Sequence, residues 1–451
     1  MKRRKRFAVS LAVVGLLLAA PALAQDGGPW TLDAAINYAQ AHNPDLQTAL
    51  SQLDEAHQAQ GEVFANFLPD LTLEGGYTYL SNVPEMEVNL AIQPLPIVEP
   101  VSIHKKFPLG YHDNRRLQVN FSQLLFASGQ VYYAYEAVDE QIRAGEHRLD
   151  AARLKVSQAT AEAFLGVLIA QSLAQARNES LNSARAHLVE VTHRHDAGAA
   201  SRFELLRAQV EVSNIEPQVT EAERMVETTR AGLRRAMGLA PDAPAAVTGD
   251  LETAPEPVDE GAALARAEQA RPELAAYAAN RQAAEEQALS YRGAMLPAVM
   301  MTASYAYQRP YYSIDDWESN WTFGVGVRVP IFDGLQAYHA MSRARAAAET
   351  AARGQAQARA DVSLEVHNAV LALREAEVRV ASTRANVERA RQMVAIAESS
   401  YQAGALTSMD VIDAQLAATN ARLAYLKALY DYRLARVRLA AATGDQAGIG
   451  R

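Results

Sequence analysis

The sequence predicts an α+β protein built from two copies of one helix–strand–strand–helix unit. Two observations support this fold class. Short motifs recur in the same order in both halves of the 451-residue chain. In each half, long stretches with apolar residues every three or four positions, typical of paired helices, accompany two segments of period-2 alternation, typical of strands.

The first 24 residues indicate an export signal that precedes the fold. Basic residues at 2–6 come before an apolar run over 7–20, and Ala22-Leu23-Ala24 forms a small-x-small cleavage pattern. The apolar run is too short for a typical membrane-spanning helix. We therefore assign 1–24 to a signal peptide, with an uncleaved anchor as the alternative, and expect the mature chain to be exported.

Composition narrows the function classes. Loss of the five signal cations takes the net charge from −9 to −14, and such an acidic chain is a poor partner for nucleic acid. The chain has no cysteine, which excludes disulfides and a lipid-acceptor thiol. No later stretch approaches 18 consecutive apolar residues, which excludes an inner-membrane helical protein. No nucleophile motif, phosphate loop or metal-ligand spacing is present, so we expect no enzyme activity, metal or cofactor.

An internal duplication sets the predicted domain boundaries. The motifs that recur are NPDL at 43–46 with RPEL at 271–274, and DAGA at 196–199 with QAGA at 402–405. The first pair is offset by 228 residues and the second by 206, so one 22-residue difference in a single loop reconciles them. We therefore predict a first structural repeat at 25–250 and a second at 251–451.

Two strand-like segments lie in each half, as strand pairs at 70–126 and 297–332. Apolar and aromatic residues alternate with polar or small ones, most cleanly from Trp321 to Ile331. Such alternation is typical both of a half-buried strand in water and of a barrel strand in lipid, so on its own it leaves both open. The proline-rich connection at about 81–115 is predicted to be a loop.

Helical patterns occupy the rest of each half. Shorter ones, over 31–66 and 260–294, are each interrupted by a proline. Longer ones form hairpins at 128–237 and 335–443, and their regular apolar spacing with frequent seam alanine is typical of coiled-coil packing. A helix from about 336 to 400 would be roughly 100 Å long.

A single copy of these parts cannot complete a membrane structure. Four strands cannot close a barrel, and lipid does not tolerate an open sheet edge. If the strands span an outer membrane, copies of the chain must pool them. Two copies would give a filled eight-stranded barrel, and three would give a twelve-stranded barrel with a lumen. The helical hairpins would then project into the periplasm.

Several motifs together carry a resemblance. They are TLDAAI at 31–36, NPDL at 43–46, IFDG at 331–334, the Leu-Pro pairs that precede the strands and, most specific, YQAGALTSMDVIDAQ at 401–415. In their order and spacing the chain resembles a known family, the TolC-like outer membrane factors, which are ducts of bacterial efflux and type I secretion. The resemblance covers nearly the whole mature chain.

The resemblance implies an α+β membrane protein in the outer membrane, extending into the periplasm. Its fold is a long coiled-coil α-helical barrel continuous with a transmembrane β-barrel, with four strands from each two-repeat protomer of a homotrimer. Its implied function is an exit duct set in outer-membrane lipid, opened at its periplasmic tip by a periplasmic adaptor coupled to an inner-membrane pump.

The resemblance also assigns a candidate channel gate. Acids six and nine residues after the turn glycine fall on Asp410 and Asp413, which share one helix face, so three copies would ring a narrow aperture with carboxylates that favour cations. Glu204 and Arg207 are the equivalent positions of the first half and are assigned to the same gate, Arg207 as a partner for a neighbouring carboxylate. Leu406 stands where some members have an arginine, so their closed-state bonding network does not transfer. Without the resemblance, Asp410 and Asp413 are ordinary first-turn acids, favoured by the helix dipole.

The turns at the hairpin ends are assigned as adaptor contacts, because small exposed residues allow a partner hairpin to pack closely; simple helix-turn chemistry is the alternative. The assigned residues are Gly198, Ala199, Ser201, Gly404, Ala405 and Thr407. The runner-up function for the whole chain is a soluble periplasmic coiled-coil adaptor or scaffold. Four alternating segments flanked by aromatic residues disfavour it, since such a protein needs none of them.

Overall fold

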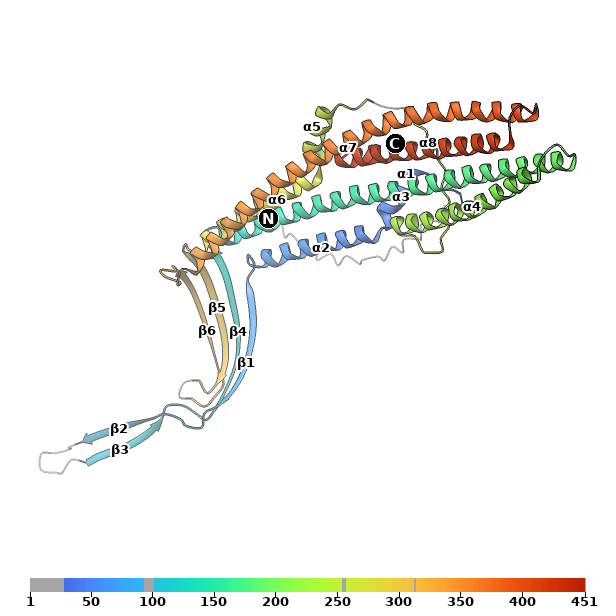
Figure 1. Ribbon diagram of the computed structural model, residues 1–451. Coiled ribbons are helices and arrows are strands. Elements are labelled where there is room, and N and C mark those ends of the chain that lie inside the picture. The colour runs from blue at the N-terminus through green and yellow to red at the C-terminus, as the bar shows by residue number, and fades with distance from the viewer. Residues whose placement is uncertain (1–27, 93–100, 254–256, 312–313, 451) are drawn as a thin grey trace, which may run out of the picture.

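A computed structural model describes residues 28–92, 101–253, 257–311 and 314–450. The predicted signal peptide, 1–24, lies outside these residues. The described chain is elongated, with long helices in one part and a curved sheet in the other (Figure 1). None of the described helices combines the length and apolar character that crossing a membrane requires.

Each half of the chain begins with two shorter helices that meet at a proline. They are α1 (Leu32–His42) and α2 (Pro44–Ala65) in the first half, and α5 (Glu260–Ala270) and α6 (Pro272–Gly293) in the second. A residue before proline is disfavoured in helical conformation, and Asn43 and Arg271 are accordingly extended. The Asn43 amide also donates to the Ala236 carbonyl at 2.8 Å. The predicted interruptions are therefore confirmed.

Two long helical hairpins follow the sheet strands. They consist of α3 (Gln130–Asp196) with α4 (Arg202–Met237), and α7 (Gln336–Gln402) with α8 (Ser408–Ala442), followed by the short α9 (Gln446–Ile449). Helices α3 and α7 each contain 67 residues, which corresponds to roughly 100 Å at the rise of an α-helix. The predicted long helix is confirmed, and α3 packs beside α8 to join the two hairpins (Figure 1).

Each return helix ends at a glycine that no other residue could replace without strain. Gly238 and Gly444 have φ values of +75° and +72°. A Cβ on Gly238 would lie 2.6 Å from the His42 carbonyl oxygen, and one on Gly444 would lie 2.8 Å from that of Ala270. The ends of α4 and α8 therefore pack directly on the ends of α1 and α5, in the same way in both halves.

The largest apolar core lies where α1, α3, α4 and α8 converge. Phe164, Leu165 and Leu233 are at most 2% exposed there. A second core joins α5, α7 and α8 around Val366 and Val370, which are fully buried. These cores hold the end of each return helix against the middle of α3 and α7, and a third core near the turns, around Val191, Tyr401 and Val411, packs the ends of the two hairpins together.

The main sheet has four antiparallel strands in the order β1-β4-β5-β6. They are β1 (Asp70–Tyr79), β4 (Asp113–Phe126), β5 (Ala298–Arg309) and β6 (Glu318–Arg328). The prediction of four sheet strands per chain is confirmed, with β1 and β6 as open edges. The predicted extent of the last strand to Ile331 is wrong: β6 stops at Arg328, because Pro330 has no N–H to donate to a ladder.

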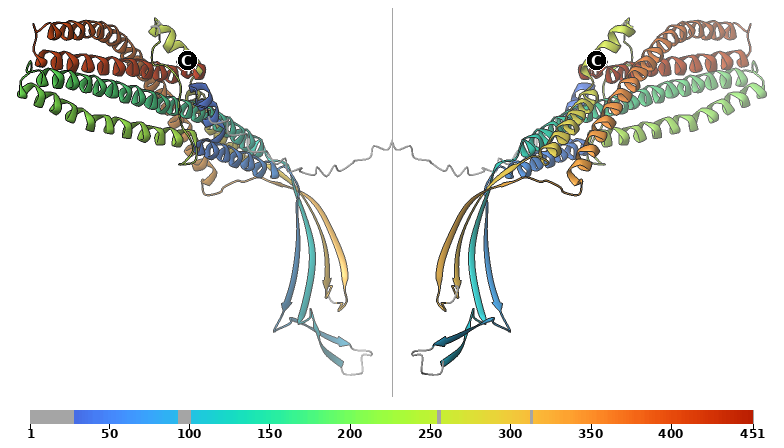
Figure 2. Two further views of the ribbon diagram at one scale, coloured as in Figure 1. Left: turned by 90° about the vertical axis from the view of Figure 1, so that its right-hand side faces the viewer. Right: turned by 90° about the vertical axis from the view of Figure 1, so that its left-hand side faces the viewer.

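The prediction of a loop over 81–115 is also wrong. This segment contains the antiparallel pair β2 (Glu85–Ile92) and β3 (Val101–Pro108), which extends beyond the far end of β1 and β4 (Figure 2). Met86, Val88 and Leu90 alternate with polar residues, which is a strand pattern. The prolines that favoured a loop are compatible with it, because Pro108 stands at the end of its strand.

Candidate functional site

The four-stranded sheet has one apolar face. Residues paired across the strands point to the same side, and the register aligns Leu73, Val119, Tyr305 and Trp321 in one row. Its apolar and aromatic residues include Leu71, Leu73, Tyr77, Leu117, Val119, Phe121, Tyr305, Tyr307, Trp321, Phe323, Val325 and Val327. The register also places Arg115, Gln123, Arg309 and Ser319 on this side. Most of the apolar side chains are exposed, with Trp321 at 73%.

The opposite face of the sheet is mainly polar. Its polar residues include Thr72, Glu74, Thr78, Arg116, Gln118, Asn120, Ser304, Gln308, Asn320 and Thr322, and Leu124 and Met300 lie on the same side. Cross-strand contacts on it include the Ser304 and Thr322 hydroxyls at 2.8 Å and an Arg116 Nε–H that donates to Gln308 Oε1 at 3.2 Å. Strands that alternate apolar and aromatic outside with polar inside are typical of membrane barrels.

The turns at the far ends of the helical hairpins have the same geometry. Gly198 and Gly404 have φ values of +75° and +77°. The N–H groups of Ala199 and Ala405 each donate to the carbonyl five residues earlier, at 2.7 and 2.8 Å, which is a Schellman ending. No atom lies within 4 Å of the Cβ position at either glycine, so both turns are open to an approaching surface.

Two of the four gate candidates cap the return helices. The Ser201 N–H donates to Glu204 Oε2 at 2.8 Å, and the Glu204 N–H donates back to Ser201 Oγ at 3.2 Å. In the second hairpin, the hydroxyl and the N–H of Thr407 both donate to Asp410 Oδ2, at 2.6 and 2.8 Å. These two bonds, the hydroxyl first, hold the pKa of the exposed Asp410 carboxyl below its usual value.

The other two candidates, Asp413 and Arg207, lie one turn further along their helices. Asp413 is exposed on the same face of α8 as Asp410, and Arg207 on α4 is half-buried. Within the described part of the chain, no hydrogen bond or ion pair joins the α8 acids to Glu204 or Arg207. The two α8 carboxylates therefore keep free oxygen atoms that face solvent.

Two contacts near the turns join the hairpins to each other, and sequence reasoning missed both. His187 Nε2 on α3 lies 2.8 Å from Ser408 Oγ on α8. The Arg194 guanidinium lies 4.4 Å from the centroid of the Tyr401 ring, and its Nη1–H donates to the Tyr401 carbonyl at 2.9 Å. The partners are more than 200 positions apart. The sequence feature that could have indicated the first contact is His187 itself, a histidine in the apolar row of α3.

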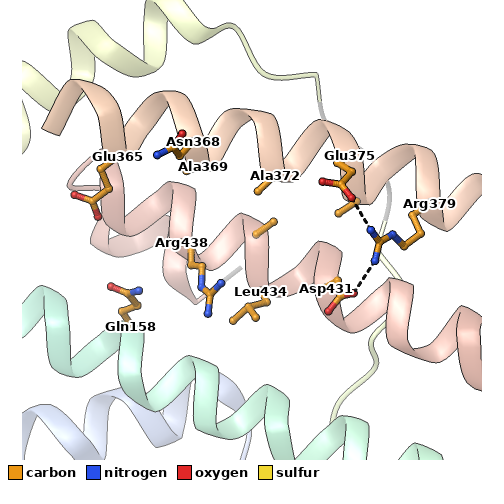
Figure 3. A pocket seen from close by; sticks show the side chains of 12 residues that line it. Gln158, Glu365, Asn368, Ala369, Ala372, Glu375, Arg379, Asp431, Leu434 and Arg438 are labelled. Atoms are coloured by element: carbon orange, nitrogen blue, oxygen red, sulfur yellow. Dashed lines mark hydrogen bonds and ion pairs between the residues drawn. The ribbon is translucent and has the colours of Figure 1, made fainter. Parts of the chain in front are cut away.

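A polar cavity of about 520 Å³ lies between α3, α7 and α8 (Figure 3). Its charges are paired, since Arg379 contacts both Glu375 and Asp431. Among the described residues, no group of three or more His, Cys, Asp or Glu side chains is placed to hold a metal ion. The charged side chains of Arg379, Glu375 and Asp431 are thus satisfied by one another, and the sheet faces and hairpin ends carry the functional interpretation.

Comparison with known proteins gives one consistent family. A family model described as "Outer membrane efflux protein" matches residues 35–239 and 263–445. The outer membrane efflux protein BepC of Brucella suis is 25% identical over 355 residues, 75% of each chain. The cobalt-zinc-cadmium resistance protein CzcC of Cupriavidus metallidurans is 24% identical over 434 residues, 94% of this chain and 92% of that protein.

A solved structure shares the fold. The CmeC outer membrane channel of Campylobacter jejuni superimposes with a TM-score of 0.75 at 18% identity, over 92% of this chain and 86% of that chain. At this identity the likeness concerns the fold alone. Together with the family match, it confirms the predicted fold class and the resemblance from which the gate candidates were taken.

Proposed function

Because this chain belongs to the outer membrane efflux protein family, whose members form the exit duct of an efflux system, we propose how its duct is assembled. Three copies pool their four-stranded sheets into one twelve-stranded barrel in the outer membrane. The apolar faces contact lipid, the polar faces line a lumen, and the helical hairpins extend the duct into the periplasm. Each copy contributes two structural repeats, at 25–250 and 251–451.

The observation that carries this proposal is the sheet itself. It exposes a broad apolar and aromatic face, and both of its edge strands, β1 and β6, lack a neighbour in the single described chain. Lipid does not tolerate unpaired backbone groups, so β6 of one copy must pair with β1 of the next. Eight strands would leave the interior filled by side chains, whereas twelve leave a passage. A soluble adaptor, the runner-up, has no use for such a sheet.

We further propose that Asp410 and Asp413 form the narrowest ring of the duct. Three copies contribute six carboxylates, in two layers one helical turn apart, and such a ring favours cations. The Thr407 bonds orient the Asp410 carboxylate and keep it ionised. Glu204 and Arg207 flank this ring from the first hairpin, where Arg207 is free to pair with a carboxylate of a neighbouring copy.

Efflux channels of this family work with a periplasmic adaptor and an inner-membrane pump. We propose that the adaptor contacts the two hairpin turns, Gly198-Ala199 with Ser201 and Gly404-Ala405 with Thr407. Both turns are exposed and leave space around their glycines, so the small hairpin of a partner can approach their backbones. The requirement for small residues at the turns is testable, since a bulky side chain at Ala199 or Ala405 would block contact without disturbing the Schellman bonds.

Conductance in planar bilayers tests the duct and its gate. We expect purified protein to give a small, cation-selective conductance that multivalent cations block. The double variant Asp410→Ala, Asp413→Ala should conduct more and be blocked less, because the carboxylate ring is gone. Asp196→Ala is the matched control, since it removes an exposed acid at the same end of the molecule but outside the ring. A double variant that conducts and is blocked like the unchanged protein would remove the gate assignment.

A further inference from the structure

The first turn of α8 is held against the other hairpin by a buried polar contact. His187 is 8% exposed and Ser408 is fully buried, and His187 Nε2 lies 2.8 Å from Ser408 Oγ. Ser408 is the first residue of α8, only two positions before Asp410. The contact therefore fixes, from α3, the helix end on which the proposed gate acids stand.

The surroundings of His187 fit a neutral ring. The His187 ring meets the buried Tyr401 ring edge-on, with centroids 5.6 Å apart. Arg194 covers that same Tyr401 ring at 4.4 Å. The positive, amino-terminal end of α8 also points toward this site, and a helix terminus of that sign disfavours a cation.

Burial and the charged groups on the neighbouring elements shift the pKa of His187 in opposite directions. Burial is the main effect and lowers the pKa of the His187 imidazole, while Glu398 on α7 and Glu190 on α3 oppose it. Glu398 also accepts a hydrogen bond from Gln415 on α8 at 3.1 Å. From α4, Glu204 acts on the neighbouring Tyr401. Desolvation thus outweighs the two acids closest to the ring.

We infer that His187 is a positioning residue for the gate: its contact with Ser408 holds α8 against α3, and protonation of the buried ring releases that end of α8. This rests on the proposed gate at Asp410 and Asp413. Separation of α8 from α3 requires no new binding partner for His187, because water hydrates the protonated ring once the two hairpins part. The hairpin contact is then a proton-sensitive element that widens the duct as the surrounding pH falls.

The direction follows from the two states of the contact. Hydrated histidine titrates at about pH 6.5, whereas the buried ring titrates lower. The closed contact is therefore fully favoured above about pH 6.5 and is progressively weakened as pH falls below that value. Between about pH 7.5 and pH 5.5 the linkage can shift the open-to-closed ratio by at most about tenfold per copy.

Bilayer conductance at these two pH values tests the inference. The conductance of the unchanged protein should rise on acidification. In His187→Gln the amide can still reach Ser408 but does not titrate, so the rise should disappear while conductance at the higher pH stays low. His193→Gln is the matched control, because this exposed histidine lies on the same helix six positions on, and it should keep the response. The Asp410 carboxyl does not interfere, since its lowered pKa leaves it ionised throughout.

Hydrogen exchange separates this inference from the proposed function. Amides over 404–412 should exchange faster in the unchanged protein than in His187→Gln at about pH 5.5, and equally at about pH 7.5. Comparison at one pH cancels the intrinsic pH dependence of exchange. If no channel forms but this difference is found, the duct proposal fails and the contact stands. If the two proteins exchange equally at both pH values, or His187→Gln keeps the conductance rise, the inference is overturned.

Discussion

A lysine placed on the apolar face of the sheet should be far more costly than one placed on the polar face beside it. Phe323 lies in the middle of β6, 62% exposed and aligned with Ala303 on the apolar face. Thr322 is its neighbour on the polar face. On the lipid side of a barrel, a lysine at the bilayer midplane costs about 2–4 kcal/mol. Three copies of Phe323→Lys should therefore destabilise the barrel by about 6–12 kcal/mol.

The control Thr322→Lys places the same charge at the same depth in a lumen where water can hydrate it. It loses the exposed hydroxyl contact with Ser304, which is worth about 0.5–1.5 kcal/mol. Refolding from urea into lipid bilayers measures both free energies, and barrel formation can be followed by resistance to unfolding in detergent gels. Equal stability of the two lysine variants would refute the assignment of lipid-facing and lumen-facing sides.

Three further outcomes are expected. Gly238→Ala should lower the thermal unfolding temperature more than Gly404→Ala. Both substitutions place a side chain at positive φ, which costs about 1–2 kcal/mol, but only the Cβ added at Gly238 would meet the His42 carbonyl oxygen at 2.6 Å. Equal losses in the two variants would contradict this. Phe164→Ala should cost about 3–5 kcal/mol in urea unfolding, since its side chain is 2% exposed in the largest core, and a loss below 1 kcal/mol would not fit that burial. The hydrogen bonds between Thr407 and Asp410 should persist at pH values above 3.8, the usual carboxyl pKa, and be lost only as pH falls below it, because the pKa of Asp410 is lowered. The Thr407 amide resonance in NMR, followed from about pH 5 downward, should report this loss. A change that is complete above about pH 4 would contradict the prediction.

The helical framework was predictable because its signals are local and repeated. Apolar spacing located the two 67-residue helices, and prolines located the breaks at Asn43 and Arg271. The alternation of residues in β1, β4, β5 and β6 predicted four strands. It did not predict whether their apolar face contacts lipid or a soluble core, since both environments produce the same pattern.

The missed features depend on contacts that sequence spacing does not encode. The β2–β3 pair was hidden because prolines near its ends outweighed the alternation of Met86, Val88 and Leu90. The contact of His187 with Ser408 joins residues 221 positions apart, and only the packing of α3 on α8 brings them together. The capping role of Asp410 agrees with the simpler interpretation of a first-turn acid, and it is compatible with a place in the gate.

Imaging of single particles in lipid discs tests most directly whether the open-edged sheets of several chains form one barrel. We expect a threefold particle with a hollow barrel inside the disc and a helical extension of roughly 100 Å on one side. Particles that contain one chain, or that lie outside the lipid with their sheets unpaired, would contradict the assembly on which the duct depends.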